Sequence, residues 1–431
     1  MKIGIDISSL QGAHRMRGIG YTTINFLENI PETNKDEYIF FLDNNAPLGG
    51  DEVMKSLNLQ IKNYGLQYFT GKATKKHLPW KFRCITKLLA KLSDVSVYRR
   101  GDKRYGNLSE LDAFIQFDQS KPLPAGARNV KKYFVGYDLI PYILEKDYLI
   151  SYRTARQKGL IKRAALKSAV NRYAYLKKLK LNCKRADYII AISETTKQDY
   201  IKYCGVPGSK ISVVTLGVSD MTTSVEKSTG IINRYRKTSW GYIPRPTSLK
   251  HKNFLLFVGG ADDRRRLHDL IAAFNHLKAQ GSDITLVLSG DTMKGPLDIP
   301  TSNIQKALLS TSYLDDIYFV GFTDNATRNW LYKHATAFVF PSVYEGFGLP
   351  VLEAMSLGTP TICYRNRAVE EVASTIPFYA HDVLSLVDTI RNVQALSGSN
   401  TLKARLSNGI EHTTEYTWQK TAKKVVHLVH K

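Results

Sequence analysis

The sequence has few cysteines, a shortage of acidic residues and no long apolar run. Its four cysteines lie far apart and show no metal-binding or redox spacing: Cys84, Cys183, Cys204 and Cys363. No apolar run approaches the roughly 20 residues that a membrane-spanning helix needs. The start, Met1–Ile7, is too short and too acidic for a signal peptide and is typical of a first strand. We therefore expect a reduced, cytoplasmic protein without disulfides.

The shortage of acidic residues leaves the chain strongly basic. It has 61 lysines and arginines against 38 aspartates and glutamates, a formal net charge of +23. Such a charge attracts anionic surfaces and polyanions over a long range, in a salt-sensitive way. The excess is concentrated in two parts of the first half, Lys72–Arg104 and Arg153–Arg185. Both a membrane surface and a nucleic acid are candidate partners on this ground.

The pattern of apolar residues predicts an α/β protein. With 431 residues the chain can form two domains. Apolar runs alternate with segments of helical spacing, which favours parallel βαβ units. Strands are expected at Lys2–Ile7, Tyr38–Leu42, Ala113–Phe117, Lys132–Val135, Tyr188–Ile192, Ile211–Val214, Phe254–Val258, Ile284–Leu288, Ile317–Val320, Ala337–Phe340 and Thr361–Tyr364. Residues 221–252 lack periodicity and contain two prolines, so we expect a linker there.

The most informative segment is Pro341–Met355. It follows an apolar run and contains Gly346 and Gly348, which let the backbone pass close to a ligand. Pro350 is suited to a first helical turn. A strand, a glycine loop and a helix N-terminus together form an anion site, because unpaired N–H groups point outward there. Two carboxylates, Glu345 and Glu353, flank this site and could accept bonds from sugar hydroxyls.

This segment resembles the E-x7-E signature of the family 4 retaining glycosyltransferases. The resemblance implies the GT-B fold, in which two Rossmann-like domains face each other across a cleft. It also implies that Glu345 contacts the transferred sugar, that Glu353 contacts the nucleotide ribose, and that backbone amides come from Gly346, Phe347, Gly348 and Leu349. The last residues, 416–431, would form a helix that packs back on the first domain. The expected layout is an acceptor domain 1–220, a linker 221–252 and a nucleotide-sugar domain 253–415.

Six further pieces resemble the family in the family's order. They are Arg17–Thr22, Ala186–Glu194, Val258–Gly260, Ser289–Asp291, Val320–Phe322 and Thr417–Ala422. From these pieces Gly18, Gly20, Gly260, Gly290 and Phe322 are added to the predicted donor site. Any one glycine-rich piece is weak evidence, because many βα turns use glycine.

Three consecutive arginines, Arg264–Arg266, are expected to open the helix after Gly259–Gly260. Cations oppose the dipole at a helix N-terminus, so local stability does not explain them. A diphosphate at this place would need such charge as its bond to a sugar breaks. The family usually has Arg-Lys-Asn here, so Arg264 matches and Arg265 keeps only the charge of the lysine. The alternative is a solvated basic turn.

On the acceptor side, Tyr137–Pro141 resembles the family segment His-Asp-Leu-x-Pro. Tyrosine, with a pKa of about 10, would not accept a proton as histidine does near neutral pH. Asp138 is therefore the candidate that orients or deprotonates the acceptor hydroxyl. The alternative, weighed equally, is that Asp138 caps a turn before Pro141. His14 is a lesser acceptor-side candidate.

A membrane contact is also expected. Phe82, Ile85, Leu89 and Leu92 recur at helical spacing among lysines and arginines, as in a helix that lies on a membrane surface. The same pattern suits a helix docked on its own sheet. In the resembling enzymes the acceptor is commonly a lipid-linked glycan on the inner face of the cytoplasmic membrane, which fits this location.

The predicted function is retaining transfer of a hexose, such as mannose, rhamnose or glucose, from a GDP-, UDP- or dTDP-linked donor to a glycan in cell-surface polysaccharide synthesis. No cofactor and no metal are expected, because arginines and helix N-termini replace a divalent ion in this fold. The alternatives are a non-catalytic scaffold of the same fold and a basic polyanion-binding protein. Nucleic-acid binding lacks any reading motif, and an epimerase or phosphorylase does not fit E-x7-E.

Overall fold

The computed structural model describes residues 1–12, 15, 18–32, 35–69, 105–106, 108–124, 127, 129–145, 148, 153, 156, 162–219, 221, 232–238, 241–247, 253–299 and 302–431. The chain divides into two compact units. The first comprises Met1–Gly217 with Trp418–Lys431, and the second comprises Val218–Thr417. Within the described ranges, no helix is both long enough and apolar enough to cross a bilayer.

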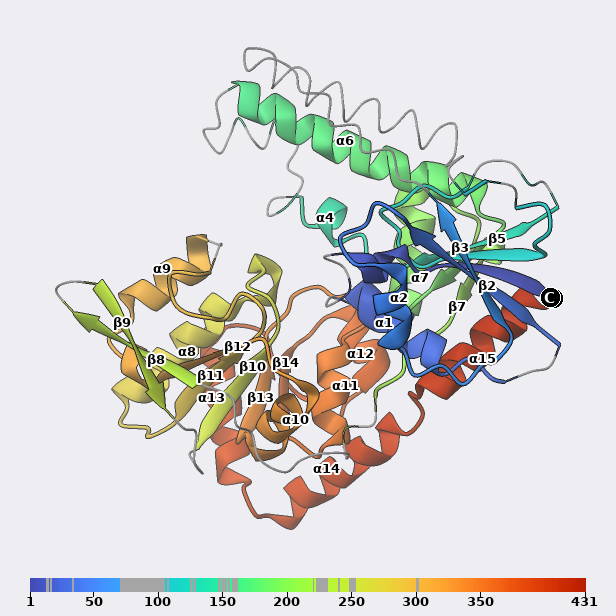
Figure 1. The fold of residues 1–431 in the computed structure, drawn as a ribbon. Coiled ribbons are helices and arrows are strands. Elements are labelled where there is room, and N and C mark those ends of the chain that lie inside the picture. Colours follow the sequence, from blue (N-terminus) through green and yellow to red (C-terminus); the bar gives the residue numbers. More distant parts are fainter. Residues whose placement is uncertain are drawn as a thin grey trace. The chain divides into compact units, whose positions relative to one another are not determined.

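The first unit contains a parallel sheet with the strand order β3-β2-β1-β4-β5-β6-β7 (Figure 1). The strands are β1 (Lys2–Asp6), β2 (Glu37–Asp43), β3 (Tyr64–Phe69), β4 (Ala113–Gln116), β5 (Lys131–Gly136), β6 (Tyr188–Ala191) and β7 (Ile211–Val213). Its central strands are buried over almost their whole length, as strands covered on both faces are. The sequence predicted six of these strands but not β3, which alternates exposed and half-buried residues up to Phe69.

Helices cover this sheet. They are α1 (Gly18–Glu28), α2 (Gly50–Lys55), α4 (Ile140–Ile143), α6 (Lys162–Arg185), α7 (Glu194–Asp199) and α15 (Trp418–Val429). The last helix, α15, packs on α1, where the Trp418 ring meets Tyr21 edge-on at 5.9 Å. The chain thus returns to the first unit at its end.

The second unit contains a sheet with the order β15-β14-β13-β10-β11-β12-β8-β9. Six of its strands are parallel: β10 (Phe254–Val258), β11 (Thr285–Ser289), β12 (Ile317–Gly321), β13 (Ala337–Phe340), β14 (Thr361–Tyr364) and β15 (Phe378–Ala380). The expected α/β fold with two Rossmann-like parallel sheets is confirmed.

The expected linker differs from the structure. Two antiparallel strands, β8 (Ile232–Thr238) and β9 (Gly241–Thr247), form a hairpin within residues 221–252, and β8 pairs with β12. The hairpin was missed because its strands are polar and β9 contains Pro244 and Pro246. An edge strand tolerates such residues, since one of its sides needs no ladder partner.

The helices of the second unit are α8 (Leu267–Ala279), α9 (Ser302–Ser310), α10 (Asn325–His334), α11 (Leu349–Ser356), α12 (Arg367–Ala373), α13 (Val383–Ala395) and α14 (Asn400–Thr413). The apolar stripe of α8 lies in the main core with the inner faces of β10 and β11. Packing on both faces of the sheet fixes where its strands end.

Both sheets have a topological switch point, a place where the strand order reverses. It lies between β1 and β4 in the first sheet and between β10 and β13 in the second. Connections from neighbouring strands leave in opposite directions there, and ligands of open α/β sheets bind outside the carboxyl ends of these strands. The residues after β10 and β13 are therefore the first place to seek a site.

Candidate functional site

The segment after β13 runs through Glu345 into helix α11. Gly348 precedes the helix with φ of 109°, a left-handed conformation that favours glycine. A Cβ atom at Gly348 would lie 3.2 Å from Val369, so the loop also packs tightly. Pro350 lies in the first turn of α11, as predicted. The first N–H groups of a helix can bind an anion, although that of Val351 already donates to the carbonyl of Gly348 at 2.9 Å.

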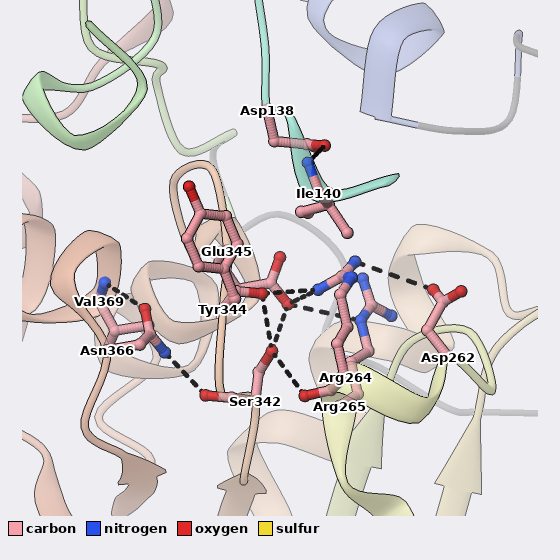
Figure 2. A network of polar contacts seen from close by, with 10 residues as sticks. All are labelled: Asp138, Ile140, Asp262, Arg264, Arg265, Ser342, Tyr344, Glu345, Asn366 and Val369. Atoms are coloured by element: carbon pink, nitrogen blue, oxygen red, sulfur yellow. Dashed lines mark hydrogen bonds and ion pairs between the residues drawn. The ribbon is translucent and has the colours of Figure 1, made fainter. Parts of the chain in front are cut away.

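Glu345 is the centre of a charged cluster that joins the ends of β10 and β13 (Figure 2). Its Oε1 forms a hydrogen-bonded ion pair with Nη1 of Arg264, and both residues are 8% exposed. Nη1 of Arg264 also donates to the carbonyl of Tyr344 at 3.2 Å. The other guanidinium nitrogen, Nη2, lies 3.8 Å from Asp262. A buried pair of this kind is held by several contacts, as its desolvation requires.

Two further groups hold the same carboxylate. The Nε atom of Arg265 lies 3.6 Å from Oε1 of Glu345, and the hydroxyl of Ser342 donates to that oxygen at 2.9 Å. Asn366 in turn donates to the carbonyl of Ser342 at 2.8 Å (Figure 2). Ser342 and Asn366 were not singled out from the sequence. With Asp262, this cluster contains two arginines and two carboxylates beside the loop.

Glycines at the strand ends make room for Arg265. Gly259 has φ of 148°, and a Cβ atom there would collide with the Arg265 guanidinium. Gly290 has φ of 150°, and a Cβ atom there would collide with the carbonyl of Gly259. Gly260, the predicted donor residue, has no such neighbour within 3.5 Å. The sequence singled out Gly260 in this turn, but Gly259 is the residue whose lack of a side chain the packing requires.

Glu353 lies on α11 and has different partners. The hydroxyl of Tyr332 donates to its Oε2 at 3.1 Å, and Nη1 of Arg328 lies 3.9 Å from Oε1. Burial raises the pKa of Glu353, and Arg328 and Tyr332 oppose this shift. Arg328 and Tyr332 are four residues apart on α10, so they share one helix face. No signal in the sequence connected them with Glu353.

We had expected the three arginines to open helix α8, but they do not. Arg264 and Arg265 lie in a short 3-10 helix, Asp263–Arg265, and α8 begins only at Leu267. Arg266 separates the two with φ of 47° and ψ of 36°. This left-handed residue breaks the helix and is where the family usually has asparagine, which tolerates that conformation better.

The remaining predicted donor residues of this unit differ in accessibility. Gly346 and Phe347 are buried, and the Phe347 ring packs edge-on against Tyr416 at 6.1 Å. Phe347 can therefore offer only its backbone to a ligand. Leu349 begins α11, and the Phe322 side chain, which follows β12, is 54% exposed.

In the first unit, the predicted glycine loop is helical. Gly18 and Gly20 lie in the first turn of α1, which begins at Gly18. Gly18 is exposed and Gly20 is buried. The helix can begin at these glycines because the N–H groups of a first turn need no acceptor within the helix, and glycine is tolerated there. His14 lies outside the described residues, as do the basic segment Lys72–Arg104 and the apolar stripe within it.

Tyr137 is buried, and burial raises its pKa above the usual value of tyrosine. It therefore keeps its proton, in line with our expectation that it does not replace a histidine base. Asp138 accepts a hydrogen bond from the N–H of Ile140 at 3.1 Å, which is the turn-capping contact of the alternative interpretation. That contact uses Oδ1 of Asp138 and does not exclude a role in catalysis. Ser193 caps α7, where its side chain accepts a hydrogen bond from the N–H of Thr196.

Among the residues that the structure describes, no three histidine, cysteine or acidic side chains gather where they could hold a metal ion.

Two family models match the chain. Residues 242–375 match the model described as glycosyl transferases group 1, and residues 149–220 match glycosyltransferase family 4. The first match contains Arg264, Glu345 and Glu353, so it covers the whole charged cluster.

Curated relatives are similar over about half of the chain. The O-antigen chain mannosyltransferase B of Escherichia coli is 24% identical over 54% of this chain and 58% of its own length. The serotype-specific mannosyltransferase WbdA of Escherichia coli is 28% identical over 58% of this chain and 29% of its own. The O-antigen chain mannosyltransferase RfbU of Salmonella typhimurium is 26% identical over 51% of this chain and 54% of its own. The matched part is thus well under two thirds of each relative.

Solved structures resemble the chain over its whole length. The structure of HepE from Anabaena with UDP and glucose has a TM-score of 0.61 at 14% identity and covers 100% of this chain and 99% of its own. WaaG, a glycosyltransferase involved in lipopolysaccharide biosynthesis, has a TM-score of 0.58 at 12% identity, with 100% and 99% covered. These neighbours show the fold, and the family models show which parts of the chain are similar in sequence. The chain has the GT-B fold and is similar to the group 1 and family 4 glycosyltransferases over residues 242–375 and 149–220.

Proposed function

We propose that this chain is a retaining glycosyltransferase that moves a hexose from a nucleoside-diphosphate sugar to a glycan in cell-surface polysaccharide synthesis. The observation that supports it most is the joining of Arg264, Arg265 and Glu345 at the switch point of the second sheet. Cations and a carboxylate together suit a ligand with both phosphates and sugar hydroxyls.

In this proposal the donor diphosphate lies between the two arginines and the first turn of α11. Arg264 and Arg265 neutralise the charge that develops on the phosphate as its bond to the sugar breaks. The N–H groups of α11 provide further donors for the phosphate oxygens. Glu345 accepts hydrogen bonds from hydroxyls of the transferred sugar, and Glu353 accepts them from the ribose. Gly260, Gly290 and Phe322 lie at neighbouring strand ends and complete the donor site.

Retention follows from attack on the face that the phosphate leaves. Arg264 and Ser342 donate to Oε1 of Glu345, which lowers the nucleophilicity of this carboxylate. The acceptor hydroxyl therefore attacks the sugar directly, and its proton passes to the departing phosphate. Asp138 orients that hydroxyl from the acceptor domain.

Mannose is the first donor sugar to test, because the relatives named above are described as mannosyltransferases of O-antigen chains. GDP, UDP and dTDP sugars remain the donor candidates. We propose a lipid-linked glycan as the acceptor, at the inner face of the cytoplasmic membrane.

Helix α6 supports a contact with an anionic membrane. Its sequence has six lysines, three arginines and no acidic residue. A groove of about 480 Å³ lies between α6 and Tyr142 and is lined by Arg172, Tyr173, Lys177 and Lys180, among others. Tyr173 is 57% exposed, so an aromatic ring stands beside the cations. Rings and long basic side chains of this kind suit the boundary between headgroups and acyl chains.

The alternative is a polyanion-binding or scaffold protein of the same fold, which the basic charge also suits.

The membrane contact can be tested by changing the lysines of α6. Lys177→Glu together with Lys180→Glu should reduce sedimentation with phosphatidylglycerol vesicles and leave transfer to a soluble acceptor intact. Equal sedimentation of the variant and the wild-type chain would contradict the membrane contact.

The direct test of the function is transfer of labelled sugar from GDP-mannose, UDP-glucose or dTDP-rhamnose to short glycans on an alkyl chain. We expect a product from one donor, with the anomeric configuration of the donor retained when it is examined by NMR. Product of inverted configuration would contradict the mechanism. No product from any donor, with a folded chain that still binds vesicles, would favour the scaffold.

A further inference from the structure

Gln119 makes three side-chain hydrogen bonds, and two of them hold the backbone of the acceptor-side segment. It lies in the loop after β4, whereas Tyr137 and Asp138 follow the neighbouring strand β5. Its Oε1 accepts from the N–H of Tyr137 at 3.0 Å. Its Nε2 donates to the carbonyl of Asp138 at 3.1 Å. One side-chain amide thus satisfies two consecutive residues of the segment.

Tyr200 contacts both Gln119 and the end of the strand that precedes this segment. Its hydroxyl donates to Oε1 of Gln119 at 3.0 Å. A Cβ atom at Gly136 would lie 2.9 Å from the Tyr200 ring, so the ring packs directly against the end of β5. Tyr200 is completely buried. The amide of Gln119 is therefore fixed on one side by a buried phenol and on the other by the segment that it holds.

The side chain of Asp138 is fixed separately. Its Oδ1 accepts from the N–H of Ile140, which sets the carboxylate relative to its own backbone. The direction of the carboxylate in the domain then depends on where that backbone lies. Gln119 controls this position, because its two bonds span the peptide unit between Tyr137 and Asp138.

We propose that Gln119 is a positioning residue for transfer, acting through Asp138 on the acceptor hydroxyl. This inference depends on the proposed function, in which Asp138 orients the acceptor. A leucine at position 119 would fill similar volume but leave the Tyr137 N–H and the Asp138 carbonyl without their partner, and such groups move to find new ones. A misplacement of about 1 Å can cost roughly 100-fold in rate.

The experiment compares three variants of the whole chain. Gln119→Leu removes all three bonds, and Gln119→Glu keeps an accepting oxygen for Tyr137 but loses the donor to Asp138. Gln67→Leu is the matched control, because Gln67 is also half-buried and donates to a backbone carbonyl, that of Tyr105 at 3.4 Å. Two quantities are measured: hydrogen exchange at the Tyr137 amide, and steady-state transfer from GDP-mannose to an octyl mannobioside.

We expect Gln119→Leu to speed exchange at Tyr137 and to lower kcat about 10- to 100-fold. The Kd for the donor nucleotide should not change. Gln119→Glu should fall between Gln119→Leu and the wild-type chain, and Gln67→Leu should match wild type in both measurements. A purely structural role would not separate kcat from donor affinity in this way.

Unchanged exchange at Tyr137 in Gln119→Leu would overturn the inference whatever the activity. Faster exchange with wild-type kcat would overturn the positioning role. A wild-type chain that transfers no sugar to any acceptor would contradict the proposed function instead, and the exchange rates would still decide whether Gln119 holds the segment.

Discussion

The two sheets share one topology, yet their switch points hold their carboxylates in different ways. In the first sheet Asp6 ends β1 and is buried; its hydrogen bonds come from neutral donors, and the cation of Lys121 lies nearby. The hydroxyl of Tyr105 donates to Oδ2 at 2.5 Å, Gln116 donates to the same oxygen at 2.9 Å, and the N–H of Ser8 donates to Oδ1 at 2.8 Å. In the second sheet Glu345 is held chiefly by Arg264 and Arg265.

The difference shows what a switch point needs in order to bind an anion. Burial acts to raise the pKa of Asp6, but Lys121, Ser8 and Tyr105 outweigh it and hold the pKa below the usual value. The protein's own side chains thus stabilise this charge, and the cluster is structural. Around Glu345 the partners are guanidinium groups: Arg264 and Arg265 pair with Glu345 and Asp262, and such groups can bind a phosphate as well as a carboxylate. The two sheets thus share the place, and the arginines distinguish the second one.

The largest effect should come from breaking the second cluster. Arg264→Ala and Glu345→Gln should each lower transfer at least about 100-fold. The first removes a cation that stabilises charge on the leaving phosphate, and the second removes the carboxylate that accepts hydrogen bonds from the sugar. Each single change also removes the nearest partner of a buried charge, at a cost of up to about 3–5 kcal/mol in the free energy of unfolding. Kinetics and thermal unfolding measure the two effects separately.

The double variant Arg264→Met with Glu345→Gln separates stability from chemistry. It removes both charges and should approach wild-type stability while remaining inactive. Arg365→Ala is the control, because its pair with Glu370 is exposed and worth little. An active double variant would contradict the site.

A matched pair of tyrosines tests whether the two switch points differ in role. Tyr105→Phe removes a bond to buried Asp6 and should lower the free energy of unfolding by about 1–3 kcal/mol with unchanged nucleotide affinity. Tyr332→Phe removes a bond to Glu353 and should weaken nucleotide binding. Calorimetry and denaturant unfolding of both variants check this. If Tyr105→Phe weakened nucleotide binding as much as Tyr332→Phe, the contrast would fail.

The pH dependence of Glu353 should be opposite to that of Asp6. Because folding raises the pKa of Glu353 above 4.5, the folded state favours its neutral form. Its contribution to stability is present below pH 4.5 and is lost as the pH rises through the raised value. Asp6 contributes above its unfolded value and loses that contribution as the pH falls. Thermal unfolding of Glu353→Gln and wild type across pH 4 to 8 should show the variant gaining relative to wild type at higher pH. A constant difference would contradict this account.

The smallest effect concerns Arg266. Its left-handed backbone costs arginine about 1 kcal/mol, which asparagine would partly recover. Arg266→Asn should therefore raise stability slightly, and transfer should stay near wild type if only Arg264 and Arg265 contact the phosphates. Denaturant unfolding and steady-state kinetics measure both. A large loss of transfer would place Arg266 in the site.

The sequence was most informative where burial is continuous. Phe254–Val258 is apolar throughout, and the predicted strand and β10 coincide. Strand β3 escaped prediction because exposed Tyr64, Leu66 and Tyr68 alternate with Gly65 and Gln67. Three-residue β15 is too short to give a periodic signal. Local patterns thus predict buried central strands better than edge strands, whose pairing depends on distant neighbours.

The sequence proposed the candidate residues but not their contacts. Glu345 came from the E-x7-E motif and Arg264 from the run of arginines, yet they are 81 positions apart and meet only because β10 and β13 are neighbours. The sequence did not predict that Arg264 and Arg265 lie in a separate turn before α8. This arrangement depends on the left-handed backbone of Arg266, which no propensity favours. Ser342, Asn366, Tyr332 and Arg328 support the carboxylates from other elements, and their spacing carries no signal.

The most direct test of the central claim is calorimetric titration of GDP, UDP, ADP and dTDP into the wild-type chain, the double variant of Arg264 and Glu345, and Tyr105→Phe. The account predicts that one nucleotide binds the wild-type chain, that the double variant loses this binding, and that Tyr105→Phe keeps it. Nucleotide binding that survives in the double variant, or no binding of any nucleotide to the wild-type chain, would contradict the claim that the second switch point is the donor site.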